Sequence, residues 1–233
     1  MMNLERFFEI QFNDVIIIRE RLRKFVEDHL QRLSVQNTAN QYDQMITDTQ
    51  AVYESFFGAI QDKDTRFSLQ QSRTKSMNNV MESFKKAVSL REGLIKNYFN
   101  ADSPEYQEFF PYGRTEYHDA SLENIETLLN RMVTYCTAHS AVLGSSIVTE
   151  FTTYKTKFLT ARGDQLQVKG QVSDALEAAA QHRNALEIQL TKNVLTIALA
   201  HIGNKNAAAM FFDQSIIRTS ATADETPAPP PNN

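Results

Sequence analysis

The sequence predicts an all-α protein, an elongated antiparallel bundle of about four to six helices. Residues 1–226 contain only two prolines, Pro104 and Pro111, so most of the chain lacks the residue that interrupts helices. On both sides of these prolines, apolar side chains recur at intervals of three or four residues, as on one face of an α-helix. The 233 residues are also enough to bury a core without a metal ion or a disulfide.

Three helices are predicted before the prolines. The first has an apolar stripe over residues 4–33, with an interruption expected near residues 34–37. Two further stripes predict separate helices over residues 42–60 and 67–98. The prolines then lie in residues 100–113, which we expect to be the long connection between the two halves of the chain.

Two more long helices and a short one are predicted after the prolines. Apolar residues there recur every 3.6 residues on average, which predicts one helix over about residues 116–160. Residues 162–164 (Arg-Gly-Asp) are interpreted as the turn that ends it, because glycine tolerates left-handed backbone and Asp can cap the next helix. That next helix is expected to end at residues 203–204 (Gly-Asn), before a short helix over residues 206–217.

Residues 1–218 are expected to form the bundle, and residues 219–233 are expected to be a disordered Thr/Ala/Pro-rich tail because they have no apolar period. One hypothesis divides the bundle into repeat halves, residues 1–111 and 112–218, each a helical hairpin. Both halves carry aromatic residues at similar spacing: Tyr53-x3-Phe57 is followed 52 residues later by Phe109-Phe110, and Tyr154-x3-Phe158 is followed 53 residues later by Phe211-Phe212. Coincidence in helices rich in aromatic residues is the alternative.

The single cysteine and the short apolar runs indicate a cytoplasmic protein. Cys136 has no partner for an intramolecular disulfide or a multi-cysteine metal site, which suits a reducing compartment. Residues 15–18 and 194–202 are the most apolar runs, and both are too short to cross a bilayer. A membrane is therefore not an expected partner.

The net charge of −4 is distributed unevenly. Residues 65–96 hold seven cations and two anions, a balance of +5, which leaves −9 for the remainder. We interpret this segment as a solvated face that complements acidic neighbours in the bundle, with a phosphate-binding strip as the alternative. Nucleic acid is not expected, because interleaved aromatics and an overall basic charge are missing. The candidate basic face comprises Arg66, Arg73, Lys75, Lys85, Lys86, Arg91 and Lys96.

No catalytic, cofactor-binding or metal site is expected. Helical bundles that hold two iron ions use Glu-x-x-His pairs, and the sequence contains none. Glu116, His118, Asp119 and Glu123 are close enough in sequence to hold a metal ion. We favour the simpler interpretation, in which acidic residues near a helix start are stabilised by the helix dipole.

Three other chemically distinctive features receive structural interpretations. His139 lies on an apolar stripe without a carboxylate one turn away, which predicts a hydrogen-bonded histidine in the bundle rather than a general base. Cys136 is predicted to be a small core residue. Gly144-Ser145-Ser146 is expected to lie inside a helix and to let a neighbouring helix approach closely.

Paired aromatic residues at helix ends are the candidates for contacts with a partner. Neighbouring residues of a helix point about 100° apart, so one member of a pair can enter the core while the other faces outward. The alternative is that both members plug the ends of the bundle. The candidate interface residues are Phe7, Phe57, Phe99, Phe110, Tyr112 and Phe212.

The leading functional hypothesis is a non-enzymatic structural or protein–protein interaction protein, a component of a larger assembly or a homo-oligomer. Long amphipathic helices and outward aromatic residues favour it. The partner would be another protein or a second copy, with no cofactor and no small-molecule substrate. A membrane-active helical protein of the pore-forming type and a metal-dependent helical-bundle enzyme are the alternatives.

Overall fold

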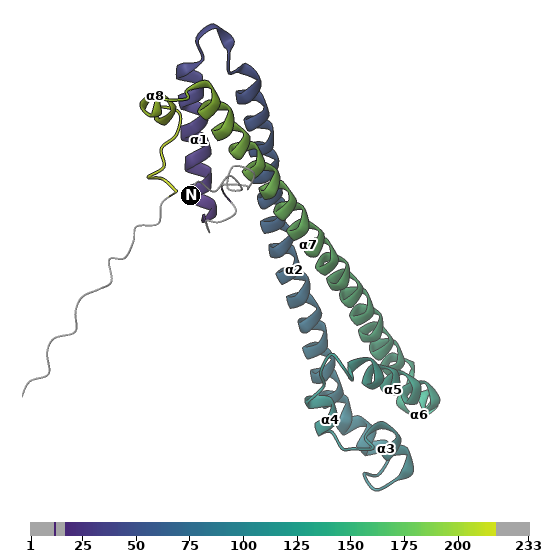
Figure 1. Ribbon diagram of the computed structural model, residues 1–233. Helices are drawn as coiled ribbons and strands as arrows, with labels where there is room; N and C mark the ends of the chain where they lie inside the picture. The colour runs from purple at the N-terminus through teal and green to yellow at the C-terminus, as the bar shows by residue number, and fades with distance from the viewer. Residues whose placement is uncertain (1–11, 13–16, 218–233) are drawn as a thin grey trace, which may run out of the picture. The chain divides into compact units, whose positions relative to one another are not determined.

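The computed structural model describes residue 12 and residues 17–217 (Figure 1). All regular secondary structure in these residues is helical, which confirms the predicted all-α class. The predicted tail and Phe7 lie outside the described residues. The helices are α1 (Arg19–Gln36), a short 3-10 helix (Thr38–Asn40), α2 (Asp43–Tyr98), α3 (Pro104–Phe109), α4 (Thr115–His118), α5 (Ile125–Ala138), α6 (Ser140–Leu143), α7 (Ser145–Ala200) and α8 (Lys205–Ala209).

The chain divides into two compact units. Unit 1 takes its described residues from Met1–Gln61 and Glu177–Asn233, and unit 2 is Asp62–Leu176. Helices α2 and α7 therefore contribute to both units. This division differs from the predicted halves, residues 1–111 and 112–218, because each unit draws residues from both of them.

Unit 1 packs α1 against the first part of α2 and the last part of α7 (Figure 1). The main core cluster centres on Phe25, Phe56 and Leu190, one from each of these helices. A smaller cluster lies beside α8, and it consists of Leu33, Tyr42, Ile197 and Phe211. Burial of such side chains contributes about 1.5–3 kcal/mol each, so unit 1 is held mainly by these apolar stripes.

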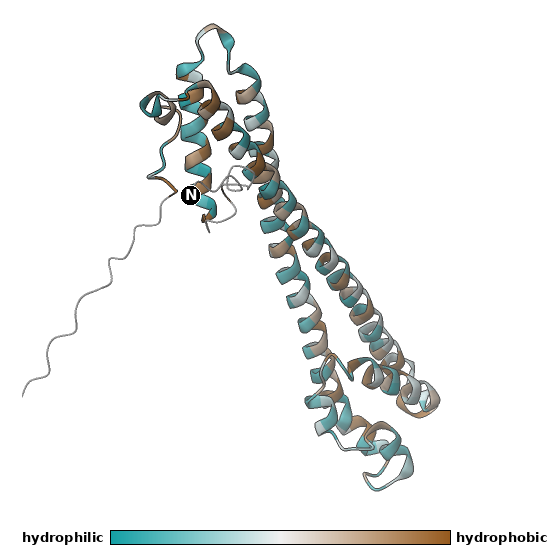
Figure 2. Cartoon of the chain, viewed as in Figure 1, coloured by the Kyte–Doolittle hydropathy of each residue, from teal (hydrophilic) through white to brown (hydrophobic). Residues whose placement is uncertain are grey.

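Unit 2 has the larger core, built from the second part of α2, the first part of α7 and the short helices between them. Phe84 of α2 meets Phe151 of α7 edge-on, with ring centroids 6.0 Å apart. The buried Tyr117 donates its hydroxyl hydrogen bond to the Phe109 carbonyl at 2.8 Å, so its polar atom is satisfied. Figure 2 shows the brown apolar residues alternating with teal polar ones along both long helices, as amphipathic packing requires.

The predicted break between residues 60 and 67 is wrong, because α2 continues through it. The intervening residues, Gln61 to Arg66, contain no proline or glycine. This polar stretch has few apolar residues, so neither predicted stripe crosses it, although its residues are compatible with a helix. Asp62 lies inside α2 and forms an ion pair with Arg66 at 2.6 Å.

The predicted helix over residues 116–160 is also wrong, since it is divided into α4, α5, α6 and the start of α7. The division before α7 lies at Gly144, whose φ of 86° and ψ of 154° leave the helical region. Gly163, which was expected to end a helix, lies inside α7. A mid-helix glycine costs about 1 kcal/mol relative to alanine, which a long packed helix can absorb. Ser145 and Ser146 begin α7 rather than lying in a helix interior.

Candidate functional site

The predicted interface aromatics fall into three classes of exposure. Phe110 is only 3% exposed and packs edge-on against Tyr117 with centroids 5.5 Å apart, so the expectation of an outward side chain is wrong at this position. The turn after α3 directs both Phe109 and Phe110 into the core. Tyr112 is 78% exposed. The other three described residues are half-buried and pack against a core cluster: Phe57, Phe99 and Phe212.

The outward member of one pair is the opposite of the one predicted. Tyr98 is exposed, whereas Phe99 stacks on Phe109 with centroids 6.4 Å apart. Phe99 also lies 4.9 Å from the His139 ring. The orientation is set by the end of α2, where the last turn places position 99 toward the core.

Phe212 covers a buried polar network in unit 1. Its ring stacks on His29 with centroids 4.3 Å apart. His29 of α1 lies within 3.0 Å of the Asn193 amide of α7, and that amide also donates to the Thr49 hydroxyl of α2 at 2.7 Å. The Thr49 hydroxyl donates in turn to a main-chain carbonyl of its own helix, that of Met45. Three helices are therefore joined through side chains that are inaccessible to solvent.

The partners of His29 determine which ring nitrogen carries the proton. Nδ1 lies 2.9 Å from the Phe211 carbonyl oxygen, which can only accept a hydrogen bond, so Nδ1 is the donor. Nε2 then accepts from the Asn193 amide. Burial lowers the pKa of His29 to about 4. His29 is thus a neutral structural residue near pH 7, and its geometry leaves no exposed nitrogen for acid–base chemistry.

An exposed apolar stripe marks the end of α7. Leu195 and Leu199 are one helical turn apart, and Ile202 lies in the turn of chain that follows the last residue of α7, Ala200. Leu199 is 72% exposed and Ile202 is 79% exposed, whereas Leu190 and Ile197 on the other side of the helix are buried. This end of the helix is therefore apolar on two faces, one covered and one uncovered.

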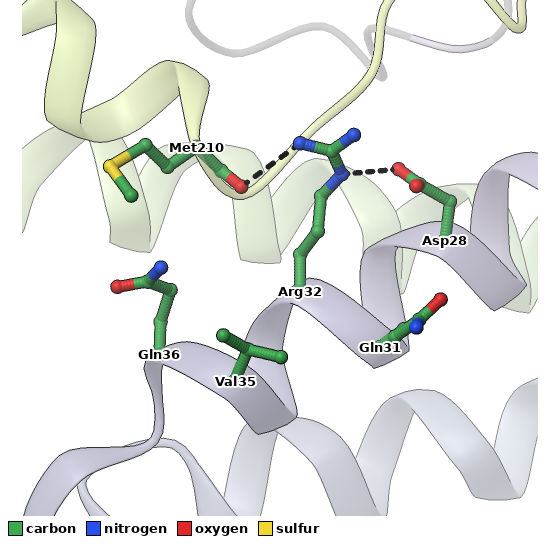
Figure 3. Close-up of a pocket in the computed structure, with 6 residues that line it drawn as sticks. All are labelled: Asp28, Gln31, Arg32, Val35, Gln36 and Met210. Atoms are coloured by element: carbon green, nitrogen blue, oxygen red, sulfur yellow. Dashed lines mark hydrogen bonds and ion pairs between the residues drawn. The ribbon is translucent and has the colours of Figure 1, made fainter.

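Val35 and Met210 are two further exposed apolar residues of unit 1. Each is exposed, and each lies within two residues of a member of the small core cluster, Leu33 or Phe211. They border a hollow of about 420 Å³, across which Arg32 of α1 donates to the Met210 carbonyl at 3.4 Å (Figure 3). We call the exposed apolar residues near the C-terminal ends of α1, α7 and α8 the apolar end of unit 1, and they are Val35, Leu199, Ile202 and Met210.

The sequence contains a signal for part of this surface. Val194, Ile197 and Ile202 read as one apolar stripe, although Ile202 is exposed because α7 ends at Ala200. Leu195 and Leu199 lie outside that stripe but are separated by four residues, which places them on a face of their own. Two apolar faces on one helix end indicate either a fully buried helix or a second contact surface.

Four cations of the predicted basic face pair with acidic residues inside unit 2. Arg73 and Arg91 of α2 reach Asp164 and Glu150 of α7, at 3.2 and 2.8 Å. The other two pairs lie within α2: Arg66 with Asp62 and Lys85 with Glu82. Within the described part of the chain, no carboxylate lies within 4 Å of the remaining three: Lys75, Lys86 and Lys96.

Two lysines of the basic face meet a second segment in a cleft of about 590 Å³. One wall is α2, and the other is Arg114 with the first residues of α4. We call this feature the basic cleft, and it is lined by Glu82, Lys85, Lys86, Val88, Ser89, Arg114, Thr115, Tyr117 and His118. The proximity of Arg114 to Lys85 and Lys86 depends on the turn after α3, which the spacing of residues in the sequence does not reveal.

The acidic residues near position 118 do not converge. Glu116 pairs with Arg131 of α5, and His118 is hydrogen-bonded to its neighbour Asp119 at 2.7 Å. Within the described residues, no group of three or more His, Cys, Asp or Glu side chains is arranged to hold a metal ion. The ion pair with Arg131 gives Glu116 a structural partner, which the sequence did not reveal.

The contacts of His139 and Cys136 are those of structural residues. His139 Nε2 lies 2.7 Å from a carboxylate oxygen of Glu108 on α3, a partner from outside its own helix. Cys136 is fully buried, as predicted, and burial raises its pKa to about 12. Its thiol is therefore protonated near pH 7 and is not a nucleophile.

Within the described residues, no helix has the length and apolar character needed to span a membrane. Comparisons of the chain with protein-family models, with curated proteins and with solved structures found no match.

Proposed function

We propose that this chain is a non-enzymatic protein that works by binding another protein chain, either a second copy or a different protein, through the apolar end of unit 1. The observation that supports the proposal is the exposure of Leu199 and Ile202 beside a core that is already closed. Water around such side chains is unfavourable, and covering each one would contribute about 1.5–3 kcal/mol.

The arrangement of this surface also favours a protein partner. Exposed apolar side chains scattered singly are ordinary, but here four of them lie near the ends of helices that share one small core cluster. Arg32 lies beside Val35 and Met210, and arginine beside apolar residues is common in protein interfaces. The Asp28 carboxylate holds Arg32 in place at 2.7 Å, which limits the entropy lost when a partner binds (Figure 3).

Tyr112 is a second predicted contact, separate from the first. It is exposed in a turn of unit 2, and tyrosine is frequent among residues that dominate binding energy. No other residue of the predicted aromatic set is as exposed among those described. Tyr112 therefore stays a candidate contact, while the main surface is assigned to the apolar end of unit 1.

The proposal is tested with the double variant Leu199→Gln/Ile202→Gln. Glutamine is a good helix former and both positions are exposed, so the fold should be retained. Light scattering over a hundredfold concentration range should show self-association of the wild-type chain that the variant loses. If the partner is a different protein, affinity purification should retain it with the wild type and not with the variant.

The matched control is Leu90→Gln, an equally exposed leucine on α2 in unit 2. It should behave as the wild type in both measurements. A wild-type chain that is monomeric at every concentration, and that retains no protein in preference to the double variant, would contradict the proposal.

A further inference from the structure

The basic cleft of unit 2 has the size and construction of a small-molecule site. Its volume of about 590 Å³ falls within the range typical of ligand pockets, about 300–1,000 Å³. Val88 and Tyr117 line it and are buried residues of the unit 2 core. The polar groups at its rim come from two segments that the fold brings together, α2 and residues 114–118.

Positive charge dominates this rim. Lys85, Lys86 and Arg114 are basic residues, and Glu82 is the single acidic residue of the lining. The lining residues therefore carry +3 and −1, a balance of +2, in a chain whose net charge is −4. Cations converging from separate segments repel one another, and an anion between them would relieve that repulsion.

The carboxylate partners of these three cations do not occupy all of their N–H donors, so donors remain for a further anion. Lys86 has no carboxylate within 4 Å in the described part of the chain. Lys85 pairs with the exposed Glu82 three residues earlier on the same helix, and exposed pairs of this kind contribute little. Arg114 donates one N–H to Glu92 at 3.3 Å, and a guanidinium has five.

Hydroxyl groups complete the set of donors. Ser89 of α2 and Thr115 of α4 line the same cleft and are exposed. Ammonium, guanidinium and hydroxyl donors arranged around one hollow match a phosphate group, whose oxygens accept several hydrogen bonds at once. A planar carboxylate has two acceptor oxygens and would use fewer of these donors.

We propose that the basic cleft binds the phosphate group of a small phosphorylated ligand, held by Lys85, Lys86 and Arg114 with Ser89 and Thr115. The inference narrows the phosphate-binding strip considered from the sequence, since only two of the seven cations in that segment enter the cleft. It concerns unit 2 and is independent of the protein contact assigned to unit 1.

The test titrates the full-length chain with inorganic pyrophosphate and follows binding by calorimetry. We expect saturable binding that Lys86→Ala weakens at least tenfold and that Lys85→Ala/Lys86→Ala abolishes. Lys86 is exposed, so the single variant keeps its fold even if the loss of the largely buried Lys85 side chain perturbs packing. The matched control is Lys96→Ala, another exposed lysine on α2, which should bind as the wild type does.

A second arm distinguishes a free phosphate compound from a lipid headgroup. The same proteins are sedimented with phosphatidylcholine vesicles that contain or lack phosphatidic acid. Pyrophosphate binding without sedimentation assigns a soluble ligand, and sedimentation that depends on both phosphatidic acid and Lys86 assigns a headgroup. No binding in either arm, or binding that the lysine variants leave unchanged, would overturn the proposal.

Discussion

Unit 1 and unit 2 bury different chemistry in their cores. Every buried side chain of polar or charged type among the described residues belongs to unit 1, and the set is His29, Thr49, Glu187, Thr191 and Asn193. The core of unit 2 is aromatic and aliphatic, with Tyr117 supplying a hydroxyl that is satisfied locally. An apolar core tolerates several arrangements of its helices, whereas a buried polar network is stable only when every partner is in place.

The difference explains how unit 1 can expose apolar residues without losing its helix arrangement. Rotation of α7 about its axis would bury Leu199, but it would also remove Asn193 from His29 and Thr49. The unmet hydrogen bonds would cost about 1–3 kcal/mol for each buried group. The network therefore fixes the face that α7 presents, and the exposed stripe follows from it.

The largest expected effect of a single substitution lies in the apolar core. Phe151→Ala should reduce the free energy of unfolding of unit 2 by about 3–5 kcal/mol, because it removes a fully buried ring that packs against Phe84. Urea unfolding followed by circular dichroism measures the loss. Leu90→Ala is the control and should change stability by less than about 0.5 kcal/mol. Equal effects of the two substitutions would contradict the assignment of this core.

The second prediction concerns the pH dependence of unit 1. The pKa of His29 is about 4 in the folded protein and about 6.5 when unfolded, so between these values the unfolded chain binds more protons. Stability should therefore be complete above pH 6.5 and fall as the pH decreases toward 4, by about 3 kcal/mol in total. Hydrogen exchange of α1 amides at pH 7 and pH 5 measures it.

A matched variant tests whether His29 causes this pH dependence. In His29→Gln, the dependence between pH 4 and pH 6.5 should be reduced, because glutamine does not titrate. An unchanged pH profile would show that other groups are responsible.

The third prediction concerns the loss of one polar side chain from the network of unit 1. Asn193→Ala should destabilise unit 1 by about 1–3 kcal/mol, because His29 Nε2 would be left buried without its donor. Combined with His29→Leu, the total loss should be smaller than the sum of the two single losses, since the ring nitrogen that lacks its donor is then removed as well. A double variant that is less stable than the sum of the single effects would contradict the network as described.

The smallest effect is expected for the buried hydroxyl of unit 2. Tyr117→Phe should cost about 1 kcal/mol, because it removes one hydrogen bond to the Phe109 carbonyl and leaves the ring in place. The same urea experiment measures it. A loss as large as that of Phe151→Ala would mean that the unit 2 core also depends on polar contacts, and the comparison between the units would fail.

Local pattern predicted much of the fold and little of the surface. The intervals between apolar residues correctly identified the helical class and the burial of residues such as Cys136 and Phe151. Helix ends were less predictable, because Gly144 and Gly163 look alike in sequence and differ only in whether the backbone leaves the helical region. The sequence does not show at which of the two glycines tertiary packing takes the backbone out of the helical region.

The polar network and the basic cleft could not have been predicted for a different reason. His29 and Asn193 are 164 positions apart, and Asn193 and Thr49 are 144 apart, so no local spacing connects them. The same holds for Arg114 and Lys86, which meet through the turn after α3. The exposed Leu195 and Leu199, by contrast, had a helical spacing of their own and could have been identified.

The most direct test of the assigned contact surface is photo-crosslinking from position 199. A photoreactive amino acid in place of Leu199 is compared with the same amino acid in place of Leu90, which is equally exposed in unit 2. We expect position 199 to yield a discrete adduct with a second protein chain, and position 90 to yield none. Absence of an adduct at position 199, or the same adducts from both positions, would contradict the claim that the apolar end of unit 1 is a protein-binding surface.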